Sequence, residues 1–344
     1  MRAMLLPRIM RVDSDARPLT WGELQDPAPQ ADEILVRVAT CGVCHTELDE
    51  IEGRTPPPRF PVIPGHQIVG HVESRGAQAR RFDVGERVGV AWIFSACGAC
   101  HFCKAGNENL CREFRATGRD AHGGYAERMC VPEAFAHPIP ERFSDTAAAP
   151  LLCAGAIGYR ALRLAVLEDG RSLGLTGFGA SAHLVLQMAR FRYPNSRVFV
   201  FARSPRQRRF ARDLGATWAG DTEATSPETL ASVIDTTPAW KPVVAALASL
   251  EPGGRLVINA IRKESGDAEA LRRLDYARHL WMEKEIKSVA NVTRNDVREF
   301  LDLAAKMQLE PEVEEFALED ANEALLQLKQ GQTRGAKVLR VRSS

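Results

Sequence analysis

Four closely spaced cysteines constrain this chain more than any other feature of its sequence. Cys97, Cys100, Cys103 and Cys111 follow one another with the spacing Cys-x2-Cys-x2-Cys-x7-Cys. Four thiolates can close a tetrahedron around one zinc ion and leave no open position for substrate. A redox pair or two disulfides are the alternatives for such a run. Cysteines this close would compete for one disulfide partner, so the spacing favours a structural zinc lobe.

Length and composition limit the class of protein. At 344 residues the chain has room for two domains of about 150 residues each. A net charge of +1 gives no strong field for nucleic acid or an anionic membrane. The N-terminal apolar stretch is too short for a signal peptide, and residues 146–159 are too few to span a bilayer. We expect a soluble cytoplasmic protein, in which the eight cysteines are ligands or buried thiols.

The beginning and the end of the chain have mixed, β-rich patterns. Residues 33–38 place Ile34, Val36 and Val38 on one face of a strand, and residues 85–92 form a second such run. Proline and glycine between them indicate turns. Towards the end we expect a helix over 296–307 and a strand over 336–341, which returns to the sheet of the first domain.

Strands and helices alternate in the middle of the chain. Strands are expected at 172–176, 197–202, 230–236 and 255–260, and helices at 182–192, 205–214 and 242–250. Ser226-Pro227 gives one further helix start, since serine caps a helix and proline suits its first position. Such alternation predicts a parallel sheet with right-handed crossovers.

A glycine turn between the first of these strands and its helix indicates a dinucleotide site. In the run from Gly177 through Gly179 to Ala182, one glycine allows the tight turn and the next lets the backbone approach a pyrophosphate. The small third residue permits close packing, and the helix N-terminus attracts phosphates. After the following strand an NAD site usually has a carboxylate, but this chain has Arg203-Ser204. A guanidinium can pair with a 2′-phosphate, so we predict NADP over NAD, with Arg208 as a further contact.

Cys44, His66 and Cys153 form a second candidate metal set. Two thiolates and one imidazole leave the fourth zinc position open for water or substrate. These residues are far apart in the sequence, so spacing alone is a weak signal. A lone histidine such as His66 is more often structural, and a cysteine such as Cys153 is more often a small buried residue.

Five motifs occur together and in order along the chain. They are Cys41–Glu47, Pro64–Gly70, Cys97–Cys111, Gly123–Glu127 and Gly177–Ala182. In this combination the chain resembles the zinc-dependent medium-chain alcohol dehydrogenases over nearly its whole length. The resemblance implies an α/β plus β-rich fold: a GroES-like catalytic domain at 1–150 and 288–344, and a Rossmann cofactor domain at 151–287. It also implies a homodimer or homotetramer.

The resemblance implies roles for the matching residues. Cys44, His66 and Cys153 match the catalytic zinc ligands; together with the structural lobe at 97–111 this makes two zinc ions per chain. Thr46 matches the hydroxyl that takes the alcohol proton. The remaining matches are His45 beside the cofactor pyrophosphate, Glu47 as the carboxylate that orients the histidine ligand, and Trp92 as a wall of the substrate pocket.

Three positions depart from the family's pattern. Gln67 stands where the family has a glutamate that can serve as a transient zinc ligand. Asp49 stands where the proton relay often ends in a histidine, so proton release uses Asp49 or bulk water. Ile157 replaces a threonine near the nicotinamide. These departures concern rate and substrate more than reaction type.

The sequence therefore predicts a zinc-dependent enzyme that transfers hydride reversibly between a primary alcohol or aldehyde and NADP(H). Trp92 and Phe94 favour an aromatic or medium aliphatic substrate. The alternatives are a polyol or amino-alcohol dehydrogenase using NAD, a family member without catalysis, and a zinc-free relative of the quinone reductases. The two zinc motifs and Thr46 argue against the last two.

Overall fold

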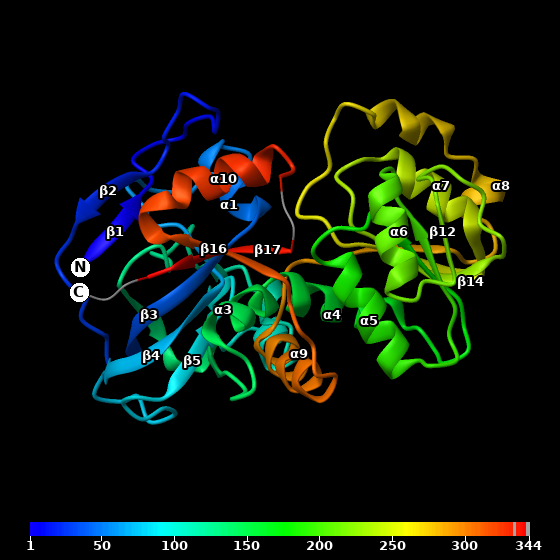
Figure 1. Ribbon diagram of the computed structural model, residues 1–344. Coiled ribbons are helices and arrows are strands. Elements are labelled where there is room, and N and C mark those ends of the chain that lie inside the picture. The colour runs from blue at the N-terminus through cyan, green and yellow to red at the C-terminus, as the bar shows by residue number, and fades with distance from the viewer. Residues whose placement is uncertain (333–334, 342–344) are drawn as a thin grey trace. The chain divides into compact units, whose positions relative to one another are not determined.

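The computed structural model describes residues 1–332 and 335–341 (Figure 1). The chain forms two compact units: unit 1 consists of Met1–Ala156 with Asn291–Ser344, and unit 2 of Ile157–Ala290. The domain boundaries expected from the sequence lie a few residues from the boundaries of these units. The assignment of catalysis to one domain and of cofactor binding to the other remains a prediction.

Unit 1 is built mainly from antiparallel strands. Its strands are β1 (Arg2–Leu5), β2 (Thr20–Glu23), β3 (Glu33–Val43), β4 (Ile68–Arg75), β5 (Arg87–Val90), β6 (Ile93–Ser95), β7 (Arg115–Ala116), β8 (Arg128–Pro132), β9 (Ala136–Pro138), β16 (Val313–Ala317) and β17 (Ala336–Arg340). Its helices are α1 (His45–Ile51), α2 (His101–Lys104), η1 (Glu108–Leu110), η2 (Glu133–Phe135), α3 (Asp145–Ala148), η3 (Ala149–Leu152), α9 (Arg294–Lys306), η5 (Leu318–Asp320) and α10 (Ala321–Lys329), while α4 (Ala154–Ala165) continues into unit 2.

The central strand of unit 1 is β3, which carries the chain to the candidate metal site. Within the described residues the main sheet has seven strands in the order β16-β17-β3-β4-β5-β9, with β8 also paired to β3. As predicted, the strand near the C-terminus returns to this sheet, since β17 pairs antiparallel with β3 and places Leu339 opposite Cys41. Strand β3 is longer than the apolar run at 33–38, because most of its residues up to Val43 are buried and the strand pairs with β4 on one side and with β8 and β17 on the other.

Unit 2 has the predicted parallel sheet. Its strands are β10 (Leu173–Thr176), β11 (Val198–Phe201), β12 (Trp218–Gly220), β13 (Leu230–Asp235), β14 (Leu250–Ile258) and β15 (Glu285–Ser288). Its helices are α5 (Ala182–Arg192), α6 (Pro205–Asp213), α7 (Lys241–Ser249), η4 (Ala268–Arg273) and α8 (Tyr276–His279). The order β12-β11-β10-β13-β14-β15 reverses between β10 and β13, as in Rossmann sheets. Figure 1 shows α5 and α6 beside these strands.

The core of unit 2 explains why its strands read as short apolar runs. All four residues of β10 and of β11 are buried, as expected for parallel strands covered by helices on both faces. Phe199, Val233 and Leu256 from three strands pack with Val243 and Leu247 of α7. No helix within the described residues combines the length and apolar character that crossing a membrane requires.

One expected element is wrong. Ser226-Pro227 does not begin a helix; the segment is irregular, and β13 begins at Leu230. Serine and proline do favour the start of a helix. However, β13, which pairs with β10, begins too soon after Pro227 to leave room for one helical turn.

Candidate active site

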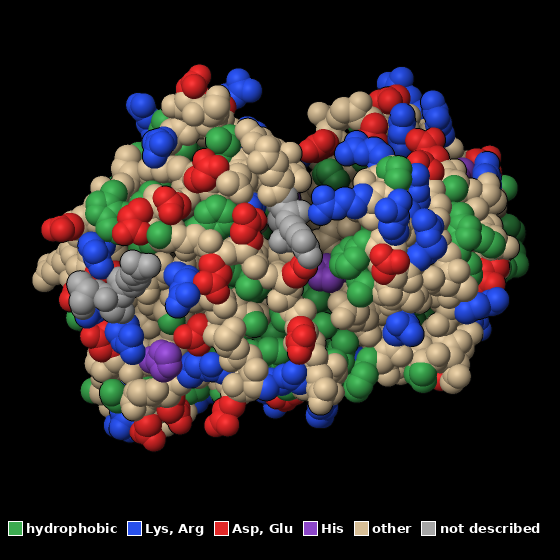
Figure 2. Space-filling view, in the orientation of Figure 1, with side chains coloured by type: hydrophobic (Ala, Val, Ile, Leu, Met, Phe, Trp, Pro, Cys, Tyr) green, Lys and Arg blue, Asp and Glu red, His purple; other side chains and the backbone are tan. Residues whose placement is uncertain are grey.

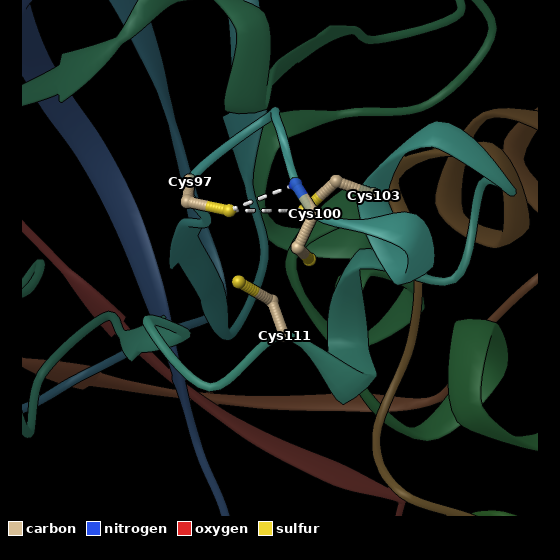
Figure 3. Close-up of side chains that lie close together, drawn as sticks. All are labelled: Cys97, Cys100, Cys103 and Cys111. Atoms are coloured by element: carbon tan, nitrogen blue, oxygen red, sulfur yellow. Dashed lines mark hydrogen bonds between the residues drawn. The ribbon is translucent and has the colours of Figure 1, made fainter.

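The four cysteines of the lobe converge, as their spacing predicted. Figure 3 shows their sulfur atoms pointing toward a common centre. The four Sγ atoms lie within 4.8 Å of one another, and the Sγ atoms of Cys97 and Cys103 are 3.9 Å apart. None of the eight cysteines forms a disulfide in the described chain. The lobe therefore presents four thiols to one point, as a closed zinc site requires.

Backbone amides donate to two of the sulfur atoms in this lobe. The N–H of Cys100 donates to Cys97 Sγ at 3.4 Å, and that of Glu113 donates to Cys111 Sγ at 3.3 Å. The first of these bonds is the main reason why the pKa of Cys97 falls to about 7. Because the thiolate is the form that binds a metal, this backbone bond prepares Cys97 for zinc, whereas burial raises the pKa of Cys103 to about 12.

The second cluster forms where β3 enters α1. Cys44 is the N-cap of α1, and its Sγ accepts from the Thr46 N–H at 3.4 Å. Cys44 Sγ lies 3.6 Å from His66 Nε2, which lies 3.3 Å from Cys153 Sγ. Ligand atoms of a tetrahedral zinc ion with these donors lie about 3.5–3.8 Å apart. The donor set and its spacing therefore fit zinc with one open position.

Glu47 fixes the orientation of the imidazole. Its Oε1 lies 2.5 Å from His66 Nδ1, and both side chains are almost fully buried. Its Oε2 accepts from the Cys44 N–H at 2.8 Å and completes the capping box of α1. With Nδ1 facing a carboxylate, Nε2 is the ring nitrogen turned to the thiols. One carboxylate thus orders both the histidine and the cysteine.

Without a metal the cluster holds protons. A hydrogen bond with Cys153, followed by burial, raises the pKa of the Cys44 thiol well above its usual range. Burial lowers the pKa of His66, but the nearby Glu47 and Cys44 charges outweigh burial and raise it. Since ligands bind a metal in their deprotonated forms, loading this site must release protons.

The other residues expected around this cluster differ in their surroundings. Thr46 is half-buried and His45 is exposed at the start of α1. Asp49 is buried and forms an ion pair with Arg54, 2.5 Å from its Nε. Gln67 is buried, and its Nε2 has no hydrogen-bond partner within the described residues.

Sequence reasoning missed one carboxyl of this region. Glu50 is 1% exposed, and Trp92 Nε1 donates to its Oε1 at 3.4 Å. Burial, followed by the charge of Glu47, raises the pKa of Glu50 to about 8. Nothing in the sequence around Glu50 indicates that its side chain is buried. Only the fold shows that this turn of α1 faces the Trp92 indole.

The glycine turn of unit 2 has the expected backbone. Gly177 has φ +77°, and a Cβ there would lie 2.7 Å from Thr236 Oγ1. A Cβ at Gly179 would meet no atom within 4 Å, so that glycine faces open space. Ala182 is buried and begins α5, whose N-cap Ser181 makes no capping bond with its side chain. The turn can therefore offer backbone amides to an anion.

Arginines gather beside this turn. Figure 2 shows Lys and Arg side chains over α6. Arg203 is exposed, and Ser204 is the N-cap of α6 without a side-chain capping bond. Arg208 Nη1 instead donates to the carbonyls of Ala202 and Arg203 at 2.7 and 2.9 Å and pairs with Asp221. Arg208 thus holds the loop that presents Arg203.

Known proteins share these features. Residues 30–141 match the family described as "Alcohol dehydrogenase GroES-like domain", and residues 209–339 match "Zinc-binding dehydrogenase". A probable alcohol dehydrogenase of Mycobacterium tuberculosis is 43% identical over 330 residues, covering 94% of this chain and 93% of that protein. An alcohol dehydrogenase of Geobacillus stearothermophilus is 32% identical over 96% of this chain and 98% of its own length.

A solved structure supports the same conclusion. A cinnamyl alcohol dehydrogenase from Sorghum bicolor matches 98% of this chain and 97% of its own, with a TM-score of 0.83 and 25% identity. The fold and the matches define an oxidoreductase with a GroES-like and a Rossmann domain. The chain belongs to the zinc-type medium-chain alcohol dehydrogenase family.

Proposed function

We propose that the protein is a zinc-dependent alcohol dehydrogenase that interconverts primary alcohols and aldehydes with NADP(H). The observation that carries this proposal is the convergence of Cys44, His66 and Cys153, with an open fourth position. Bound zinc supplies Lewis-acid chemistry, which lowers the pKa of a coordinated hydroxyl. The half-buried indole of Trp92, which packs on Phe114 with ring centroids 5.3 Å apart, favours aromatic or medium aliphatic substrates.

The chain's own residues would bind the metal, orient its ligands and move the alcohol proton. Cys44, His66 and Cys153 hold the metal, and Glu47 keeps the imidazole in place. Thr46 would accept the alcohol proton as its own hydroxyl proton passes on toward Asp49 or bulk water. Since Arg54 already pairs with Asp49, we favour water. Gly177, Gly179 and Ala182 of unit 2 would receive the cofactor pyrophosphate.

Cys44→Ser tests the zinc role. We expect zinc to fall from about two ions per chain to about one, with loss of alcohol oxidation and retention of the fold. Elemental analysis and a spectrophotometric assay measure the two effects. Cys130→Ser is the matched control, because Cys130 is half-buried on β8 and belongs to neither cluster. Retained turnover in Cys44→Ser would refute the zinc role, and a panel of polyols and amino alcohols separates the alternative substrates.

The preference for NADP rests on Arg203 and Ser204. Arg203→Glu should reverse the preference between NADPH and NADH by about 10-fold or more, because a bidentate contact to the 2′-phosphate becomes a repulsion. Arg209→Glu, also exposed and on α6, is the control and should have a small effect. Steady-state kinetics with NADPH and with NADH would measure the preference of each variant. An unchanged ratio in Arg203→Glu would end the NADP assignment.

A homodimer or homotetramer is part of the proposal. All four residues of β15, at the edge of the sheet, are exposed, including Ile286. Tyr276, Trp281 and Met282 nearby are each more than half exposed. An open strand edge with apolar neighbours suits pairing with a second copy. Light scattering of the wild type and of Ile286→Lys tests this.

A cytoplasmic location stays a prediction from the cysteine usage.

A further inference from the structure

A buried ion pair lies where the sheet of unit 2 reverses its strand order. Strands β10 and β13 are parallel neighbours at this point, and open α/β sheets bind ligands outside the carboxyl ends of such strands. Asp235 ends β13 and is fully buried. Its Oδ2 forms an ion pair with the ammonium of Lys263, whose side chain is 9% exposed.

This pair joins two strand ends and a loop. Thr176 Oγ1, at the end of β10, donates to Asp235 Oδ1 at 2.6 Å. The hydroxyl and the backbone N–H of Thr237 donate to the same oxygen at 2.8 and 3.3 Å. Lys263 Nζ also donates to the carbonyls of Thr237 and Ala239 at 2.8 and 3.0 Å. An ammonium has three donors, so Lys263 keeps none for a ligand.

The loop that Lys263 holds supports the glycine turn. A Cβ at Gly177 would lie 2.7 Å from Thr236 Oγ1 and 3.0 Å from Thr237 Cγ2, so loop 236–240 lies directly against the turn. The start of α5 has a second link to the strand ends, since Asn259 Nδ2 donates to Ser181 Oγ at 3.1 Å. The place of the glycine turn therefore depends on the loop, and the loop depends on Lys263.

We propose that Lys263 is a positioning residue for the cofactor, although its ammonium does not contact the nucleotide. Together with Asp235 it fixes loop 236–240 and thereby the glycine turn that receives the pyrophosphate. A site that is ordered before binding loses less entropy when the ligand arrives, so the pair should strengthen nucleotide binding. This inference rests on the proposed function, because it requires that unit 2 binds NADP(H).

The test removes both charges together. Lys263→Met alone would leave Asp235 buried and unpaired, which is strongly destabilising, so the variant is Lys263→Met with Asp235→Asn. The control is Arg171→Met with Glu251→Gln, a more exposed ion pair that joins the segment just before β10 to the start of β14. Titration calorimetry with NADPH and no alcohol gives the Kd. We expect a roughly 10-fold weaker Kd in the first variant and a change within about twofold in the control.

Kinetics separate positioning from general damage. The KM for NADPH should rise in the first variant, while the KM for the aldehyde at saturating NADPH stays near the wild-type value. If the double variant does not fold, Thr237→Val removes one bond to Asp235 and leaves the ion pair, and it should weaken NADPH binding to a smaller extent.

Two results would overturn the proposal. They are an unchanged Kd in a variant whose far-UV circular dichroism matches the wild type, and an equal loss of affinity in the control pair. Thr237→Val with wild-type affinity would count against it in the same way. A wild-type protein that binds neither NADPH nor NADH would instead contradict the proposed function, and this inference with it.

Discussion

At the scale of single residues, His137 on β9 is a buried histidine that belongs to neither candidate zinc site. It is 1% exposed, and neither ring nitrogen has a hydrogen-bond partner within the described residues. Burial lowers its pKa to about 3, and the charges of Arg81, Arg294 and Arg298 add to the effect. The folded protein therefore holds this ring neutral.

His137 should make the fold sensitive to acid. In the unfolded chain a histidine takes up a proton near pH 6.5, but folded His137 does so only near pH 3. As the pH falls through this window, protons bind the unfolded state first, so the stability present above about pH 6.5 is progressively lost. The loss is on the order of 1.4 kcal/mol per pH unit.

His137→Leu should remove this sensitivity. Urea unfolding of the wild type and the variant between about pH 6.5 and pH 5 gives the free energy of unfolding for each. We expect the variant to gain roughly 1–2 kcal/mol relative to the wild type across that range. Loss of zinc in acid acts on both proteins and cancels in the difference. Parallel pH profiles would show that the ring is not buried in its neutral form.

At the scale of elements, the start of α1 holds one candidate zinc ligand, Cys44, and the carboxylate that orients another. Glu47 is a helix cap and the partner of His66 at the same time. Glu47→Gln keeps an acceptor for the Cys44 N–H but removes the charge beside the imidazole. We expect zinc affinity to fall by about 10- to 100-fold, as measured by competition with a chelator. Glu133→Gln, at the start of η2 in the same unit, should leave the zinc affinity unchanged.

Elements with local signals were predicted well. The apolar spacing of 182–192 gave α5 with the observed bounds, and Ser204-Pro205 gave the start of α6. Ser226-Pro227 failed because capping chemistry is local, whereas the early start of β13 comes from pairing with β10. Ligand type and spacing likewise indicated the four-cysteine cluster. The cluster of Cys44, His66 and Cys153 needed the family resemblance as well, because its members are far apart in the sequence.

Contacts across the fold could not be predicted in this way. Lys263 and Asp235 are 28 residues apart, and nothing near either residue indicates that they pair. The pairing of Asp49 with Arg54 and the burial of Glu50 beside Trp92 also depend on packing. Charge compensation between distant residues leaves no periodic pattern, so only the structure shows which polar groups are already occupied.

At the scale of the whole molecule, the candidate ligands and the nucleotide turn belong to different units. All seven candidate zinc ligands lie in unit 1, whereas Gly177, Gly179 and Arg203 lie in unit 2. Unit 2 has its own sheet and its own apolar core. Binding of the nucleotide should therefore need no metal.

Removal of zinc should separate the two activities. Prolonged treatment with a strong chelator should abolish alcohol oxidation and lower the thermal stability of unit 1, because a structural zinc site contributes folding energy directly. NADPH affinity, measured by calorimetry on the same sample, should stay within about threefold, since the turn and its supporting loop are unchanged. Readdition of zinc should restore turnover, whereas readdition of magnesium should not, because thiolates bind magnesium poorly. Loss of NADPH binding in parallel with zinc would mean that the fold of unit 2 depends on unit 1.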